Sequence, residues 1–291
     1  MHRLFATTLT CTAIVFCVSS RPVFGDGSAW LPEPGTGHVS LFYVSQSAEE
    51  FYRGTDKRPL PGGGQEDLAQ NTVWLGGTYG LNDSFALDVQ TGWAKSQFMT
   101  GPGIPTPSDS FSGMVDTSVG LTWRIVDEVV SDLPSIALRA GTILAGDYET
   151  GFINSLGDGG DGYEVSLVVG RFLGDQVGLS AELGVRNRNE NIPGERFANL
   201  SGIWFLNDSL TLGVEYRMVN STSGLQIGGP GFAPNRFPEI EEDTQTVGAR
   251  LYYSVNENFS LSLFGASVID GRNAAASGIF GAAASYSFDF L

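Results

Sequence analysis

The sequence predicts an all-β fold, a single antiparallel up-and-down transmembrane β-barrel of about 12 strands, with short periplasmic turns and long extracellular loops. Three observations predict it. Apolar and polar residues alternate through most of the chain, the connections are alternately short and long, and no run of about 18 apolar residues follows the N-terminal region. Only 16% of the 291 residues are charged and 39 are glycine, whereas an average soluble protein has roughly 25% charged residues.

The first 25 residues have the organisation of a secretory signal peptide. Arg3 supplies a positive charge, and an apolar or small-residue stretch over 4–18 follows it. Small residues precede Asp26 at a suitable cleavage site. We therefore expect 1–25 to be a signal peptide and the mature chain to be exported.

Charge and cysteine content exclude several kinds of protein. The 32 acidic and 16 basic residues give a net charge of −16, which would repel a phosphate backbone, so no nucleic-acid partner is expected. Both cysteines, Cys11 and Cys17, belong to the predicted signal peptide. We therefore expect a mature chain without disulfides or thiolate metal sites.

Residues 26–36 separate the signal peptide from the first predicted strand. Trp30, Pro32 and Pro34 favour an extended segment, which we interpret as a periplasmic N-terminal lead-in. A short plug inside the barrel is the alternative.

The predicted barrel covers 37–291. In 210–218, for example, apolar residues occupy every even position and mostly polar ones the odd positions, which is typical of a strand with one apolar face. The predicted strands are 37–47, 69–81, 84–95, 113–125, 135–146, 163–173, 176–187, 197–206, 209–219, 244–254, 258–269 and 277–290. In 37–47 and 197–206 both faces carry apolar residues, so the inward face of these two strands stays open.

Short connections share a turn pattern. Asn82-Asp83, Gly174-Asp175, Asn207-Asp208 and Asn256-Glu257 each join two strands, and these residue types suit tight hairpins. The longer connections are rich in glycine, proline and acidic residues, and they cover 48–68, 96–112, 147–162, 188–196 and 220–243. Alternating short and long connections are typical of a transmembrane barrel.

A soluble β-sandwich or lipocalin-like barrel would show the same alternation but would bury the apolar face. An even number of strands that ends at the C-terminus favours the membrane barrel instead. So do aromatic residues on the apolar face, most of them beside the short turns, where an interfacial girdle is expected. These residues are Tyr79, Phe85, Trp123, Trp204, Tyr253, Phe259 and Phe288.

The C-terminal strand and the strand-turn-strand pattern resemble known families. Phe280, Tyr286, Phe288 and Phe290 share one face, which resembles the C-terminal signal recognised by the outer-membrane barrel assembly machinery, although Leu291 follows the last aromatic residue. The segment 74–87, WLGGTYGLNDSFAL, resembles the outer-membrane family named for the meta-pathway of phenol degradation. That resemblance implies a transporter of small, often apolar compounds.

The opposite face of each strand is predicted to line the lumen. Its charged residues are Asp88, Asp116, Arg124, Arg139, Glu164, Glu182, Arg186, Glu215, Arg217, Arg250 and Asp289. Charges of both signs predict either ion pairs across the interior or a polar constriction of a narrow pore. Glycines recur on the same face, where they would clear a passage or permit bends. They are Gly92, Gly120, Gly141, Gly170, Gly184, Gly213, Gly248 and Gly281.

Three functions remain open. The first is passive passage of small molecules, with hydrophobic or aromatic solutes implied by the family resemblance. The second is a closed structural or adhesive barrel whose acidic loops contact ions, lipopolysaccharide or other cells. The third, a hydrolase, has little support, because His38 is the only histidine after the predicted signal peptide and no Gly-x-Ser-x-Gly pattern occurs.

We therefore expect no enzyme activity, no cofactor and no metal site, since a lone histidine precludes a multi-histidine site. The acidic residues of 239–243 are interpreted as solvated loop, with calcium or magnesium binding as the alternative. The expected location is the outer membrane of a Gram-negative bacterium. The expected partners are its lipid and lipopolysaccharide, the barrel assembly machinery and a small-molecule solute.

Overall fold

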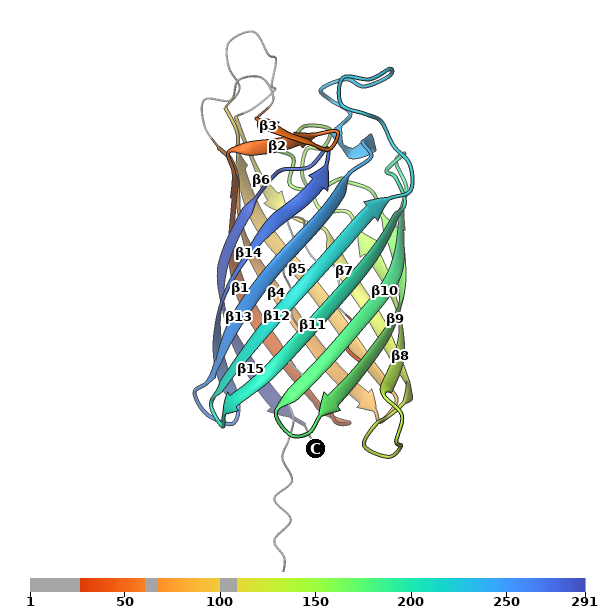
Figure 1. The fold of residues 1–291 in the computed structure, drawn as a ribbon, viewed down its shortest axis with the longest axis vertical. Helices are drawn as coiled ribbons and strands as arrows, with labels where there is room; N and C mark the ends of the chain where they lie inside the picture. Colours follow the sequence, from red (N-terminus) through yellow and green to blue (C-terminus); the bar gives the residue numbers. More distant parts are fainter. Residues whose placement is uncertain (1–26, 61–66, 100–108, 291) are drawn as a thin grey trace, which may run out of the picture.

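The computed structural model describes residues 27–60, 67–99 and 109–290, so the predicted signal peptide lies outside the described residues. The chain forms one closed antiparallel barrel (Figure 1). Thirteen strands are joined edge to edge, and pairing between β4 and β5 closes the ring. Because β6 and β7 pair with successive parts of β5, they occupy one position, and the wall has twelve positions. The predicted fold class is confirmed.

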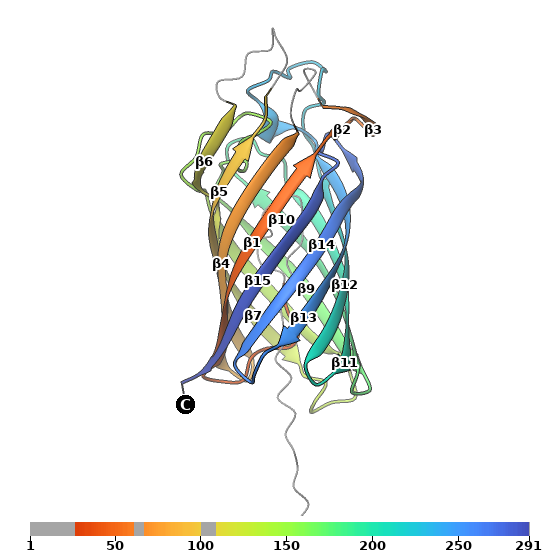
Figure 2. The ribbon, with the colours of Figure 1, turned by 90° about the vertical axis from the view of Figure 1, so that its left-hand side faces the viewer.

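Short connections gather at one end of the barrel, where the chain ends, and long connections at the other (Figure 2). We call these the turn end and the loop end. The wall strands are β1 (Thr36–Ala48), β4 (Leu68–Asn82), β5 (Phe85–Gln97), β6 (Ser110–Met114), β7 (Thr117–Val126), β8 (Ser135–Leu144), β9 (Gly162–Leu173), β10 (Val177–Arg188), β11 (Glu195–Asn207), β12 (Leu210–Ser221), β13 (Asp243–Ser254), β14 (Phe259–Arg272) and β15 (Gly278–Asp289).

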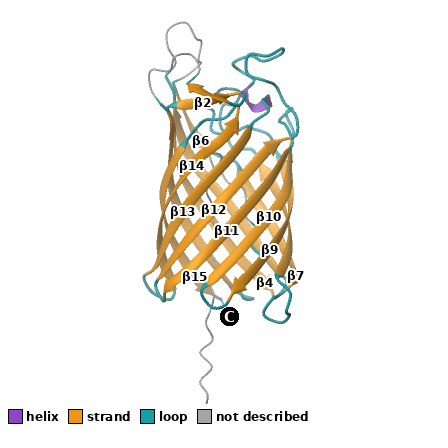
Figure 3. Cartoon of the chain, viewed as in Figure 1, coloured by secondary structure: helices purple, strands orange, loops and turns teal. Residues whose placement is uncertain are grey.

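The long connections carry a little regular structure of their own at the loop end (Figure 3). A hairpin of β2 (Glu50–Arg53) and β3 (Asp56–Pro59) lies in the first, and a single 3-10 turn, η1 (Phe237–Glu239), lies in the last. Within the described part of the chain, no helix is both long and apolar enough to cross a membrane.

The predicted strand boundaries differ from the observed ones by no more than three residues, with one interruption. The predicted strand 113–125 is divided into β6 and β7 at Val115 and Asp116. There the Asp116 carboxylate accepts a hydrogen bond from the Gly146 N–H at 3.0 Å. The alternation of residue types does not reveal this contact, because it joins the strand to a connection about thirty residues away.

Side chains alternate between an exposed apolar face and a buried, more polar face. In β1, Leu41 and Tyr43 are exposed while Ser40 is buried. In β11, which the sequence also left open, Leu200 and Trp204 are exposed and Phe197 is buried. The outside of the barrel is therefore apolar, the opposite of a soluble sandwich.

Candidate functional site

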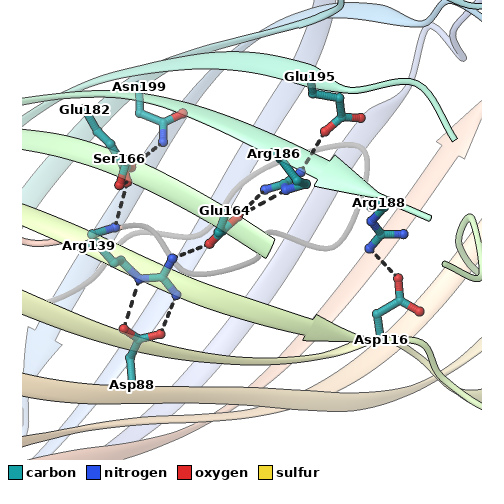
Figure 4. A network of polar contacts seen from close by, with 11 residues as sticks. Asp88, Asp116, Arg139, Glu164, Ser166, Glu182, Arg186, Arg188, Glu195 and Asn199 are labelled. Carbon is teal, nitrogen blue, oxygen red and sulfur yellow. Dashed lines mark hydrogen bonds and ion pairs between the residues drawn. The ribbon is translucent and has the colours of Figure 1, made fainter. Parts of the chain in front are cut away.

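Inside the barrel, ion pairs link five wall strands in series (Figure 4). Arg139 of β8 pairs with Asp88 of β5, with 2.7 Å between Nη2 and Oδ2, and with Glu164 of β9. Glu164 also pairs with Arg186 of β10 at 3.0 Å, and Arg186 pairs with Glu195 of β11 at 3.0 Å. The register places Arg186 directly opposite Glu164. Each buried charge in this series therefore has an oppositely charged neighbour, as burial requires.

Glu182 forms a second polar centre closer to the turn end. Its Oε1 accepts hydrogen bonds from Ser166 Oγ at 2.6 Å and from the Gly27 N–H at 3.3 Å. Its Oε2 accepts one from Asn199 Nδ2 at 2.7 Å. This carboxylate therefore joins two wall strands to the N-terminal segment.

Asp116 forms a third centre at the loop end, where it pairs with Arg188 at 2.6 Å. Arg188 also lies 3.6 Å from Asp158 of the connection after β8. Arg188 and Glu195 also point inward but were not among the predicted lumen residues, because both lie just outside the predicted strands. Arg188 shares the parity of Arg186, so extending the alternation by one residue would have found it.

Arg217 of β12 and Arg250 of β13, the two strands that follow β11 around the wall, stack on aromatic rings. The Arg217 guanidinium is 5.8 Å from the centre of the Phe197 ring, and that of Arg250 is 4.3 Å from the centre of the Phe264 ring. Glu215 lies near both arginines, and its Oε1 is buried. The negative faces of the aromatic rings attract these two guanidinium groups and help to hold them in place.

Two of the predicted lumen residues lie at the rim instead. Arg124 pairs with Asp127 at 2.9 Å and donates to the Asp83 carbonyl at 2.7 Å, so it ties two turns together. Asp289 is exposed at the end of β15. Neither joins the buried series, because each occupies the last inward position of its strand.

The predicted girdle residues lie toward the turn end. Trp123, Trp204 and Tyr253 are about half exposed. Phe85 stacks on Trp123 with 6.3 Å between ring centres, and Tyr79 stacks on Phe288 at 6.4 Å. Phe259 is partly buried.

The inward glycines accept bulky side chains from neighbouring strands. A Cβ added at Gly184 would overlap the Phe197 ring, and one at Gly281 would overlap the Phe264 ring. A Cβ at Gly120 would overlap the Arg139 guanidinium. These three glycines therefore make room for side chains that fill the interior. This role differs from both predicted ones, which were to clear a passage and to permit bends in the strands.

The N-terminal segment enters the lumen from the turn end. Ala29 is fully buried against Ala137 and Val168. Trp30 Nε1 donates to Glu128 Oε1 at 2.6 Å, and its ring lies 4.7 Å from that of Phe172, centre to centre. These contacts place 27–30 in the position of the short plug that the sequence left as an alternative to a lead-in.

At the loop end, the connection 145–161 folds into the mouth of the barrel. Leu156 is buried against Trp74, Phe111 and Val115. Tyr148 donates its hydroxyl to Asp116, and burial together with the negative charge of Asp116 raises the pKa of Tyr148. The mouth is thus narrowed by an apolar contact and an anchored phenol.

Two of the cavities lined by described residues lie beside these fillings. The first, of about 130 Å³, lies at the loop end and is lined by residues of the wall and of four connections, including Phe51, Asp116, Phe152, Arg186, Arg188, Glu195, Phe237 and Glu242. The second, of about 60 Å³, lies at the turn end beside Arg250. Its lining includes His38 and six serines, namely Ser40, Ser254, Ser260, Ser262, Ser285 and Ser287. In the described ranges, no three His, Cys, Asp or Glu side chains are grouped so as to hold a metal ion.

No protein-family model and no curated protein sequence matches the chain. Among solved structures, it is similar to an outer membrane channel from Pseudomonas putida F1, with 12% identity, a TM-score of 0.72 and coverage of 91% of this chain and 100% of that chain. The KdgM porin in complex with disordered oligogalacturonate has 11% identity, a TM-score of 0.51 and coverage of 86% and 99%. The NanC porin has 7% identity, a TM-score of 0.52 and coverage of 85% and 98%. At such low identities these similarities establish a shared fold, the closed barrel of outer membrane channels and porins.

Proposed function

We propose that the protein is a channel in the outer membrane of a Gram-negative bacterium, through which small molecules pass without an energy source. The observation that carries this proposal is the inversion of the barrel, whose outside is apolar and whose inside holds charged and polar side chains. Such a cylinder is stable in hydrocarbon and offers a polar interior. The predicted signal peptide and the channels that share the fold support the same location and role.

The passage would run along β1 and β13–β15. Toward the turn end this side is lined by small inward residues such as the buried Ser40 and Ser262, whereas Phe264 and Ile279 fill it farther toward the loop end. On the far side the ion pairs and the plug fill the space. A passage bordered by hydroxyl groups and by the Arg250 guanidinium would be narrow and would admit only small solutes. A preference for hydrophobic or aromatic solutes is supported only by the family resemblance.

Contacts outside the lumen form part of the same proposal. The exposed aromatic residues at the turn end would lie at the membrane interface, and the exposed Phe290 would form part of the signal for the assembly machinery. The acidic loops would face lipopolysaccharide. Fractionation of the producing cells tests the location, since recovery in the inner membrane or the soluble fraction would contradict it.

Single-channel recording in planar lipid bilayers tests the passage. We expect small, discrete conductance steps for the purified protein, and a several-fold smaller conductance for Ser285→Trp, because the indole would fill the serine-lined space. Ala284→Trp is the matched control, since Ala284 is the next residue of β15 and pairs with the outward-facing Leu41 and Leu261. Equal conductance of the two variants would refute the proposed path.

A closed structural barrel is the second candidate. The buried ion pairs and the N-terminal plug favour it, because together they occupy much of the lumen. A correctly folded protein that shows no conductance and no solute uptake into liposomes would establish this alternative over the channel.

A further inference from the structure

The loop-end cavity combines an apolar wall with a charged wall. We propose that it is a binding site for a small amphipathic molecule, about the size of one six-membered ring, whose polar group is uncharged or positively charged. The inference rests on the proposed function, because a solute that enters from the loop end would meet this cavity before the rest of the lumen.

The apolar wall is formed by side chains from separate connections that hold one another in place. Phe152 stacks on Phe111 with 5.9 Å between ring centres. Phe51 is buried in a cluster with Leu60 and Phe98, against which Ile153 also packs. The wall is therefore formed by packed side chains before any ligand arrives, which lowers the entropic cost of binding.

The charged wall contains more carboxylates than guanidinium groups. Four acidic residues and two arginines line the cavity, namely Asp116, Asp158, Glu195, Glu242, Arg186 and Arg188. Arg186 already lies between Glu164 and Glu195, and Arg188 lies between Asp116 and Asp158. An anionic ligand would have to compete with these carboxylates for each arginine.

The excess of carboxylates selects the charge of the ligand. Oxygen atoms of carboxylates accept hydrogen bonds from hydroxyl or ammonium groups and repel another carboxylate. The repulsion is stronger than in bulk water, because protein replaces water over much of the cavity wall and lowers the local dielectric constant. The ligand class is therefore a neutral hydrogen-bond donor or a cation attached to an apolar body.

The volume limits the size of that body. The cavity measures about 130 Å³, and an apolar protein cavity of about 150 Å³ is large enough to bind benzene. A single ring with a short polar substituent matches both the volume and the two kinds of wall.

Binding of three ring compounds of similar size to the purified full-length protein in detergent tests the inference. We expect saturable binding of benzylamine and benzyl alcohol by titration calorimetry, and at least about tenfold weaker binding of benzoate. Ile153→Trp should abolish binding of both ligands, because the indole would occupy the cavity.

Two carboxylate variants test the role of charge. Glu242→Gln should weaken the binding of benzylamine by about threefold, because it removes one negative charge from the lining. The affinity for benzyl alcohol, which is uncharged, should not change. Glu149→Gln is the matched control, since Glu149 is exposed and does not line the cavity. It should change neither affinity.

Several outcomes would overturn the inference. They are binding no greater than to detergent alone, equal binding of benzoate, and unchanged binding in Ile153→Trp. If Ile153→Trp fails to fold, Ala275→Leu replaces it, because Ala275 also lines the cavity. Conductance recorded on the same preparation separates the two proposals. A protein that conducts but binds no ligand would contradict only the proposed binding site. A protein that binds the ligands but does not conduct would contradict only the proposed channel.

Discussion

The two sides of the lumen are built in different ways. Along β5 and β7–β11, long charged side chains pair across the strands and the N-terminal segment packs on them. Along β1 and β13–β15, a space of about 60 Å³ lined by six serines and the Arg250 side chain remains at the turn end. The first side stabilises the barrel by filling it, while the second leaves the room a solute requires. One closed sheet thus separates the structural part of its interior from the part proposed for passage.

Loss of one charged group on the filled side should have the largest effect. Arg139→Met leaves Asp88 without its only ion-pair partner among the described residues and removes one of the two partners of Glu164. We expect a loss of up to about 3 kcal/mol of unfolding free energy, because the Asp88 carboxylate, which is 20% exposed, stays unpaired in a largely enclosed site. Urea unfolding in detergent, followed by gel mobility, measures it.

The matched change on the open side is Ser262→Ala, which removes only a hydroxyl from a buried position. A loss of about 1 kcal/mol or less is expected there. Similar losses for the two variants would show that the two sides do not differ in their contribution to stability.

Removal of 27–31 should have the next largest effect, this time on conductance. The deletion removes Ala29 and Trp30 from the filled side but keeps Gly35, whose N–H donates to the Gly80 carbonyl at 2.9 Å. We expect the single-channel conductance to rise about twofold to fivefold, because the pore cross-section grows. Trp30→Ala should raise the conductance by a smaller factor. If the deletion variant has an unchanged conductance, the segment does not border the passage.

A local effect is expected at the mouth. Tyr148→Phe removes the hydroxyl that donates to Asp116. We expect it to loosen the connection 145–161 by about 1–2 kcal/mol, because a hydrogen bond to a charged group is lost. Faster amide exchange in this connection and more frequent current fluctuations would report the loosening.

The same contact predicts a pH dependence. The pKa of Tyr148 is raised in the folded protein. The stabilisation of the connection 145–161 by its hydroxyl is therefore fully present below the ordinary tyrosine pKa, roughly 10, and is lost as the pH rises through the higher folded pKa. Wild-type fluctuations should therefore approach those of Tyr148→Phe only in strong alkali. A transition near neutral pH would contradict the assignment.

The sequence predicted the wall far better than the interior. Alternation located each wall position and, outside 37–47 and 197–206, its outward apolar side, since a period of two is a local property of the chain. It also placed Arg139, Glu164 and Arg186 on the inward face. It did not pair them, because pairing depends on the register between strands and on side-chain direction. Arg188 and Glu195 were missed because strand ends are where the alternation weakens.

The sequence by itself determined a barrel of about twelve strands with an apolar outside and a charged interior, because a strand with one apolar and one polar face leaves a repeat of two in the order of residues. Only the tertiary structure decided that 27–30 and 145–161 fold into the lumen. Each of these segments packs against strands distant in sequence, and no local pattern records such contacts. The space left open, and hence what can pass or bind, is set by how those segments and the inward side chains fill the cylinder together.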